Sequence, residues 1–533
     1  MDGSGSGKSA SYSIPNAFQC LGSYVFTDPK GELYDKTAGY LKSQGYEIKV
    51  LNLVNPSNSD GYNPLMHISS ELDVDVIANT IVKGQKAEAG GSDPYWDDMA
   101  EMLLKALIYY LIAKRPEEEQ NLASCSELVR AANSNGGSNL LTELINELPY
   151  DHPARMYYKS IEIAPEKTYG SILSSLQSKL GKFDSKEIAE VTSTDTINFE
   201  EIGTKKTAVY VISSDTHKAY DFLLTIFFAQ MIQQLYNFAD ENGGRLKMPT
   251  YFILDEFANI GQIPDFDKKI STSRSRGISF SVILQNLDQL EAVYEKSYET
   301  IMGNCDTHVF LGSNSFKTVE YFSKALGEKT VFRDSKSINR DKHYHKQGLS
   351  ESDQSVARAL MTPDELRRLD NDLCIIFEKG VRPVKARKFY YFEKPQMVRK
   401  LEEVRMNHLE FDAGVRGVWR KFNPYNPYVE EDNKNGEVKK DIKVESLDDL
   451  FEDDIKDQNN NTKNSNIVTE NKEKSNNNIN SQSNMQDSII LPQGEEEDDD
   501  ELFSIDVQKE LEAKFDELFG PTTVTEEDNT DKN

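Results

Sequence analysis

Cysteine and histidine are scarce in this 533-residue sequence, which contains four cysteines and seven histidines. The cysteines lie far apart and form no C-x-x-C pair: Cys20, Cys125, Cys305 and Cys374. The spacing therefore predicts neither a zinc ribbon nor a disulfide framework, and it favours a reducing compartment. His343 and His345 share a polar stretch without a third ligand, so we expect them to be solvated rather than bound to a metal.

Long hydrophobic runs are also missing. The longest, residues 103–113, is interrupted by Lys105 and spans barely a dozen residues, whereas a bilayer-spanning helix needs about 20. A run of that length suits a buried helix. We expect no signal peptide ahead of the first motif and no segment of this sequence that crosses a membrane.

Positive charge is scarce near the C-terminus. Residues 430–533 hold 31 acidic and 11 basic side chains, whereas the preceding 429 residues hold 58 and 50. The net charge of −28 therefore comes mostly from the tail and does not exclude nucleic acid as a partner of the remainder. With few aromatic residues, the tail cannot bury enough apolar surface to fold, so we predict disorder.

The tail contains a short repeat. Asp-Asp-Leu-Phe occurs at 448–451, and Asp-Glu-Leu-Phe occurs at 500–503 and 516–519. The repeat indicates either a peptide that docks on a partner protein or chance Leu-Phe pairs in an acid-biased segment.

Outside the tail, strand and helix signals alternate, which is typical of the α/β class. Short apolar runs with two apolar faces favour a parallel sheet covered on both sides. The predicted strands are 23–27, 47–52, 207–212, 250–254, 278–284 and 308–311, with helices at 33–44 and 220–236. Strand signals vanish between residues 93 and 181, which favours an all-helical insert. Residues 333–355 read as a polar loop, and 373–378 with 384–391 as a hairpin.

The N-terminus contains the end of a phosphate-binding loop. Its residues are Gly3, Ser4, Gly5, Ser6, Gly7, Lys8 and Ser9. In such loops backbone N–H groups cradle phosphates, so Lys8 would reach the β- and γ-phosphates of ATP and Ser9 would ligate Mg²⁺. Asp2 stands where the first glycine of the motif belongs, and its charge disfavours bound phosphate. Taken alone, the run also fits a flexible Gly/Ser leader.

An apolar strand ending in two carboxylates, Asp255 and Glu256, has the form of a Walker B motif. Asp255 would hold Mg²⁺, and Glu256 would orient or deprotonate the attacking water. In isolation, a buried strand stopped by two solvated acids is an equal alternative. The upstream Gly-x-Gly-Lys-Ser favours the nucleotide interpretation.

Three polar residues near the next strand complete the candidate site. Gln285 follows the strand tip, and it is a candidate sensor because a polar side chain at that place senses the γ-phosphate in RecA-like motors. Arg274 and Arg276 precede the strand, and one of them is a candidate arginine finger. Either arginine could instead be a solvated cation or a contact to DNA phosphate.

These motifs together resemble the conjugative coupling proteins of type IV secretion, the TraG/TraD group. The resemblance rests on 3–9, on Thr27-Asp28-Pro29-Lys30-Gly31-Glu32, on 254–261, on 271–285 and on Asp93-Pro94-Tyr95-Trp96. It covers residues 1 to about 400. Members of that family carry transmembrane helices and a strand ahead of the phosphate loop, so we expect an N-terminally truncated member.

The resemblance implies a RecA-like P-loop domain with an inserted all-α domain. Its expected extents are 1–92 and 196–400 for the nucleotide-binding domain, 93–195 for the all-α domain, 401–429 for an extension and 430–533 for the tail. It also implies ATP and Mg²⁺ as cofactors, with nucleotide roles for Lys8, Ser9, Asp255, Glu256 and Gln285.

The resemblance further implies a homo-hexameric ring at the cytoplasmic face of the bacterial membrane. The ring would pass single-stranded DNA and its relaxase, or relaxosome, to type IV secretion channel proteins, with the acidic tail docking partners. Candidate DNA contacts are exposed basic residues: Lys268, Lys269, Arg274 and Arg276, or Lys379, Arg382, Lys385, Arg387 and Lys388. Two rivals stay open, an FtsK/HerA-like DNA translocase and a truncated, non-catalytic adaptor that recruits substrate.

Overall fold

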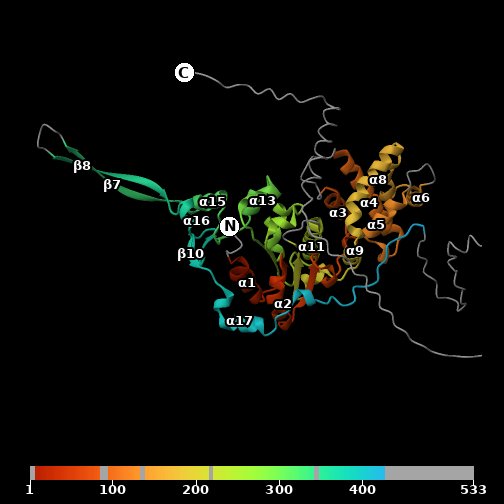
Figure 1. Cartoon of the computed structure of the whole chain (residues 1–533), viewed down its shortest axis with the longest axis horizontal. Coiled ribbons are helices and arrows are strands. Elements are labelled where there is room, and N and C mark those ends of the chain that lie inside the picture. The colour runs from red at the N-terminus through yellow and green to blue at the C-terminus, as the bar shows by residue number, and fades with distance from the viewer. Residues whose placement is uncertain (1–6, 84–93, 133–138, 215–219, 341–346, 426–533) are drawn as a thin grey trace, which may run out of the picture. The chain divides into compact units, whose positions relative to one another are not determined.

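The computed structural model describes residues 7–83, 94–132, 139–214, 220–340 and 347–425 (Figure 1). Several predictions fall outside these residues. They concern Gly3, Ser4, Gly5 and Ser6, the two histidines His343 and His345, and the tail from residue 430.

Five parallel strands form the central sheet, in the order β2-β3-β1-β4-β5. They are β1 (Ser23–Thr27), β2 (Glu47–Asn52), β3 (Thr207–Ile212), β4 (Thr250–Leu254) and β5 (Ile278–Val282). All residues of β1 and β3 are buried, as strands covered on both faces require. The register pairs Thr27 with Leu254 and Leu254 with Val282, so the carboxyl ends of β1, β4 and β5 lie at one edge. The predicted parallel sheet is confirmed.

Two separate cores cover the two faces of this sheet. Because side chains alternate along a strand, Val25 of β1 joins the core that contains α11 (Asp221–Glu241). Its neighbours Tyr24 and Phe26 join the opposite core with α1 (Ile14–Phe18) and α2 (Glu32–Ser43).

A second sheet corrects one prediction. Residues 308–311 were expected in the parallel sheet, but β6 (Thr307–Phe310) pairs antiparallel with β9 (Leu373–Glu378), which pairs with β10 (Val384–Arg387). Phe310 and Ile375 pack with α15 (Phe316–Leu326) and α16 (Pro363–Arg367) in a small core of their own. An apolar run in the sequence predicts a strand, but it does not predict which sheet the strand joins. Along the chain, α12 (Phe266–Thr272) lies between β4 and β5, and α13 (Leu287–Tyr294) and α14 (Tyr298–Gly303) lie between β5 and β6.

The polar loop predicted at 333–355 is also wrong. This stretch belongs to a long antiparallel hairpin of β7 (Glu328–Arg340) and β8 (Gln347–Ala359), seen as a two-stranded ribbon in Figure 1. Main-chain hydrogen bonds hold such a ribbon together, so its strands need no alternation of apolar and polar residues.

Between β2 and β3 the described chain is helical. Its helices are α3 (Glu71–Lys83), α4 (Pro94–Lys114), α5 (Leu122–Ala131), α6 (Leu140–Asn146), α7 (Pro153–Glu162), α8 (Glu166–Leu180), α9 (Lys186–Ser193) and α10 (Phe199–Ile202). The helix α4 packs against α3, α7 and α8, with Leu103, Leu104 and Leu107 fully buried. No helix among the described residues combines the length and apolar character that a bilayer span requires.

The described chain ends in a segment that we call the strap, residues 403–425, which follows α17 (Pro395–Glu402). It first runs along α2, where the Met406 N–H donates to the Asp35 carbonyl at 3.3 Å. It then reaches the helices: Arg420 Nε lies 2.8 Å from Glu119 Oε1, and the Phe422 N–H donates to Ser124 Oγ at 2.9 Å. We call the part built on the central sheet the sheet domain and the helices between β2 and β3 the helical bundle. The strap therefore links the sheet domain to the helical bundle (Figure 1).

Candidate functional site

The first described residues form a tight turn into a helix. Gly7 has φ +73°, a conformation that favours glycine, and its carbonyl accepts a hydrogen bond from the Ser11 N–H at 2.7 Å. A Cβ on Gly7 would also lie only 2.8 Å from the Tyr390 ring. A π-helical turn, Ser9–Ser13, follows and continues into α1. Such turns are frequent at functional sites, and this one directs Lys8 and Ser9 toward the end of β4.

The two Walker B carboxylates stand directly after β4. Asp255 is 8% exposed, and its carbonyl accepts a hydrogen bond from Thr27 Oγ1 of β1 at 2.7 Å. Glu256 adopts a left-handed conformation with φ +51°, which is uncommon for a residue other than glycine. This sharp turn at the strand end places both carboxylates at the same edge of the sheet.

The structure brings Lys8, Ser9, Asp255, Glu256 and Gln285 together. Lys8 Nζ lies 2.7 Å from Glu256 Oε1 and 3.8 Å from Asp255 Oδ1. Ser9 Oγ donates to Asp255 Oδ2 at 3.3 Å, and Gln285 Nε2 donates to Glu256 Oε1 at 3.0 Å. We call these five residues the nucleotide cluster. Residues separated by nearly 250 positions thus meet at the carboxyl ends of β4 and β5, where open α/β sheets bind ligands.

Burial has the largest influence on the pKa of Asp255 in this cluster. It raises the pKa of Asp255, and the charge of Glu256 adds to that effect, while Lys8 opposes it. Lys8 and Asp255 expose only 10% of their side chains. The single cation therefore sits between two carboxylates in a partly desolvated site, where electrostatic contacts are stronger than in water.

The oxygens of Ser9 and Asp255 fit a magnesium ion. Mg²⁺ prefers oxygen ligands and usually takes only one or two from a protein, with waters and phosphates filling the rest. A hydroxyl and a carboxylate only 3.3 Å apart supply this set. In the described part of the chain, no group of three or more acidic, histidine or cysteine side chains forms a richer metal site.

Asp28 contributes a feature that the sequence did not reveal. Its carboxylate is 2% exposed and accepts a hydrogen bond from the Tyr34 N–H in the first turn of α2 at 2.8 Å. Burial raises the pKa of Asp28 to about 6. Gly31, with φ +73°, completes the turn and packs against His408 of the strap. The Asp-Pro-Lys-Gly-Glu run thus fixes the start of α2 beside the nucleotide cluster.

Neither candidate arginine finger contacts the nucleotide cluster within the described residues. Arg276 is held by Asp240, with two N–O distances of 2.9 Å, and lies over the Tyr236 ring at 4.8 Å. Arg274 exposes 93% of its side chain and is 3.7 Å from Asp306. Arg276 is therefore anchored on its own chain, whereas Arg274 points into solvent.

Some of the candidate DNA contacts are exposed to solvent, and others are buried. Lys379, Arg382, Lys385 and Arg387 are exposed on and between β9 and β10. Lys388 is only 5% exposed, and its ammonium donates to the Leu311 carbonyl at 2.8 Å, so the expectation that it is exposed is wrong. The two lysines of the other candidate group also differ in exposure. Lys268 is exposed and paired with Asp265, whereas Lys269 is partly buried and burial lowers its pKa.

Comparisons with known proteins identify the family. The family model described as "Type IV secretory system Conjugative DNA transfer" matches residues 1–411. The chain is 26% identical over 389 residues to "Conjugal transfer protein TraG" of Escherichia coli, covering 68% of this chain and 60% of that protein. It is 24% identical over 420 residues to "Protein VirD4" of Rhizobium rhizogenes, covering 77% and 60%. The chain thus spans about 60% of the length of these curated relatives.

Solved structures confirm the fold class. The unbound conjugative coupling protein TrwBdeltaN70 superposes with a TM-score of 0.52 at 18% identity, covering 72% of this chain and 82% of that one. The plasmid coupling protein TrwB in complex with the ATP analogue ADPNP gives a TM-score of 0.50 at 16% identity, covering 78% and 86%. The predicted RecA-like α/β fold with a helical part is therefore confirmed.

Proposed function

Because the chain belongs to the type IV secretory system conjugative DNA transfer family, we propose that it is an ATP-driven coupling protein. It would recruit single-stranded DNA with its bound relaxase and pump this substrate into the conjugation channel. The nucleotide cluster carries the proposal, since the five residues with predicted nucleotide roles meet at one sheet edge.

Each residue of the nucleotide cluster has its own role in the proposed reaction. Lys8 would leave Glu256 to bind the β- and γ-phosphates, and Ser9 with Asp255 would hold Mg²⁺. When bound, the metal neutralises charge on the phosphate oxygens. Glu256, released from Lys8, would orient the attacking water and accept its proton. Gln285 donates a hydrogen bond to Glu256, so a movement of Glu256 away from Lys8 would also move Gln285 at the end of β5.

The assembly proposal concerns the arginines and the ring. We assign the arginine finger to Arg274, because its exposed guanidinium can enter the nucleotide site of a neighbouring subunit, whereas Arg276 is held by Asp240. The chain would act as a homo-hexamer at the cytoplasmic face of the membrane. DNA would contact the exposed cations of the β9–β10 hairpin.

The remaining segments complete the proposal. The sheet domain, 1–92 with 196–400, would be the motor, and 93–195 the all-α domain. Residues 401–429 would connect to the acidic tail, 430–533, which would dock the relaxosome or channel proteins.

The decisive experiment compares DNA-stimulated ATP hydrolysis by the unaltered chain with that of Lys8→Ala and Glu256→Gln variants. Each substitution removes a group needed only around the phosphates, so hydrolysis should fall by about 100-fold or more. Lys42→Ala, an exposed lysine on α2, is the matched control and should keep full activity. Hydrolysis that survives both substitutions would contradict the assigned site. A hexamer that binds DNA but hydrolyses no ATP in any form would instead support the recruiting adaptor.

A further inference from the structure

Four consecutive aromatic residues lie beside the turn that begins at Gly7. They follow β10 and lead into α17, and we call them the aromatic run: Phe389, Tyr390, Tyr391 and Phe392. The Tyr390 ring packs on Gly7, where an added Cβ would lie only 2.8 Å from it. The short turn Tyr391–Glu393 packs against the π-helical turn Ser9–Ser13. The aromatic run therefore borders the place where the phosphates of a nucleotide would bind.

Tyr390 has a fixed position in this run. Its side chain is buried, and its hydroxyl donates to the Asn371 carbonyl at 3.1 Å, in the turn that precedes β9. The ring is thus held between Gly7 on one side and the β9 turn on the other. A buried tyrosine whose hydroxyl has found a partner is a rigid surface for another ring to stack on.

Phe392 stacks on Tyr390 and remains exposed. The two ring centroids lie 4.9 Å apart with an interplanar angle of 20°, and Tyr391 meets the Phe392 ring edge-on at 5.7 Å. Phe392 is nevertheless 56% exposed. Because one face of the ring is covered by Tyr390, this exposure belongs largely to the opposite face. A single exposed phenylalanine is ordinary on a protein surface, but this one is held in place beside the phosphate-binding turn.

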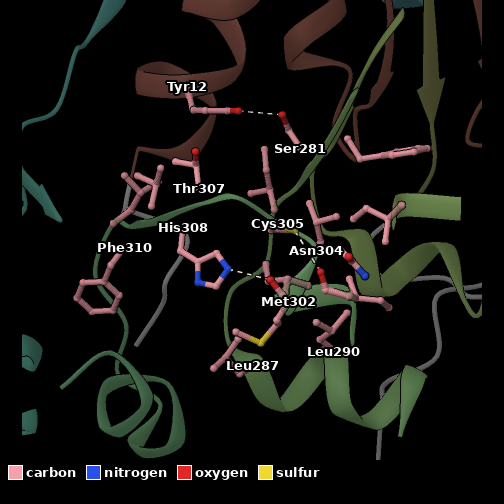
Figure 2. Close-up of a pocket in the computed structure, with 18 of the residues that line it drawn as sticks. Tyr12, Ser281, Leu287, Leu290, Met302, Asn304, Cys305, Thr307, His308 and Phe310 are labelled. Atoms are coloured by element: carbon pink, nitrogen blue, oxygen red, sulfur yellow. Dashed lines mark hydrogen bonds between the residues drawn. The ribbon is translucent and has the colours of Figure 1, made fainter. Parts of the chain in front are cut away.

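The turn Ser9–Ser13 is itself fixed against the central sheet. The Tyr12 hydroxyl meets Ser281 Oγ of β5 at 2.8 Å (Figure 2). Lys8 and Ser9 contact the carboxylates at the end of β4. A nucleotide whose phosphates bind at Lys8 and Ser9 carries its base only one ribose away, so the base must lie close to this turn. The exposed ring of Phe392 is an apolar surface in that neighbourhood.

We propose that the exposed face of Phe392 stacks on the purine base of bound ATP, with Tyr390 supporting the ring from behind. The proposal rests on the proposed function for the presence of a nucleotide, and it adds the site for the base. Stacking on a ring that is already held in place costs little ordering entropy. It recognises the face of the base, which every base has, so Phe392 supplies affinity while the nucleotide cluster handles the phosphates.

Calorimetric titration with two ligands tests the proposal without hydrolysis. Phe392→Ala should bind a non-hydrolysable ATP analogue with Mg²⁺ about tenfold more weakly than the unaltered chain. Its binding of inorganic triphosphate with Mg²⁺ should not change, because that ligand has no base. The matched control is Phe389→Ala, which removes a 48% exposed ring of the same run that lies 5.1 Å from Lys394 Nζ. It should bind both ligands like the unaltered chain. Equal affinity of Phe392→Ala and the unaltered chain for the analogue would overturn the proposal, whereas tight binding without hydrolysis of ATP would contradict only the proposed motor.

A tryptophan variant reports on the contact directly. Phe392→Trp keeps an aromatic face, so it should bind the ATP analogue at least as tightly as the unaltered chain. The chain contains two other tryptophans, so the emission of the unaltered chain is subtracted. The remaining indole emission should be quenched by the analogue and not by inorganic triphosphate, because only a stacked base contacts the ring. Emission that the analogue does not quench would overturn the proposal. Quenching by single-stranded DNA alone would also overturn it, since the base on Phe392 would then belong to DNA.

Discussion

Lys8 is shared by two acidic residues, and this arrangement sets the chemistry of the site at the scale of single residues. Its ammonium lies 2.7 Å from Glu256 and 3.8 Å from Asp255, so the carboxylates hold the cation where phosphate oxygens would otherwise bind. In the proposed function, nucleotide binding would therefore exchange one set of acidic oxygens around Lys8 for another.

This exchange predicts the effect of Glu256→Gln on affinity. The substitution removes one carboxylate charge that competes for Lys8, so a fluorescent ATP analogue with Mg²⁺ should bind several-fold more tightly, up to about tenfold. Equilibrium titration measures the change. Glu241→Gln, at the exposed end of α11, is the control and should bind like the unaltered chain. Equal or weaker binding by Glu256→Gln would mean that the Lys8–Glu256 contact does not compete with phosphate.

A second prediction concerns Asp28 and pH. Burial raises the pKa of Asp28 to about 6, from about 3.9 in an unfolded chain, so the folded protein binds more protons between these values. The contribution of this group to the free energy of unfolding is therefore present at pH 4 and lost as the pH rises to about 6. This difference in pKa between the folded and the unfolded chain corresponds to about 3 kcal/mol.

Asp28→Asn isolates this contribution, because asparagine can still accept the Tyr34 N–H. The stability of the unaltered chain relative to the variant should fall between pH 4 and 6 and then stay constant. Urea unfolding of both proteins across this range measures the difference. A difference that does not vary with pH would contradict a raised pKa.

Residue types and their order sufficed to select Lys8, Ser9, Asp255, Glu256 and Gln285, because each follows a recognisable local pattern. Their roles stay predictions, although the structure brings them together. Tyr390, which packs on Gly7, lies nearly 400 positions away and has no local signal. The burial of Asp28 likewise depends on the strap and α2, which only the folded chain brings together.

At the scale of elements, burial decided which strands could be predicted. The bounds of β1, β3 and β4 agree with those read from the sequence, because strands buried on both faces appear as short apolar runs. The β7–β8 hairpin escaped prediction because backbone pairing leaves no side-chain pattern there. The strand β6 was found but assigned to the wrong sheet, since its partner β9 lies some 65 residues later.

The contact between α2 and the strap makes a prediction about Gly39. A Cβ at this position would lie 1.6 Å from the Val404 carbonyl oxygen, so Gly39→Ala must displace the strap or α2. We expect a loss of about 1–3 kcal/mol of stability and faster proteolysis after residue 403. Gly181→Ala is the matched control, because its Cβ would meet no atom within 4 Å. If both variants are cleaved at the same rate, the strap is not held at this position.

At the scale of the whole described molecule, the strap is a mechanical link between the sheet domain and the helical bundle. Phe422 anchors its far end: the side chain is 1% exposed and lies 4.3 Å beneath the Arg115 guanidinium. Arg420 adds an ion pair with the buried Glu119.

Phe422→Ala should weaken this link. Removing a buried phenylalanine costs about 3–5 kcal/mol, and here the loss falls on the contact between the two parts. We expect calorimetry to show the helical bundle melting at lower temperature, separately from the sheet domain. Phe392→Ala, whose ring is 56% exposed, should melt like the unaltered chain. A uniform shift of one transition in Phe422→Ala would show that the strap does not connect the two parts.

The far end of the strap is held by a further contact. Tyr425, the last described residue, donates its hydroxyl to the Ala131 carbonyl at the end of α5, so the described chain ends against the helical bundle. A segment that is anchored at both ends limits how far the parts that it joins can separate, so the strap ties the sheet domain to the helical bundle.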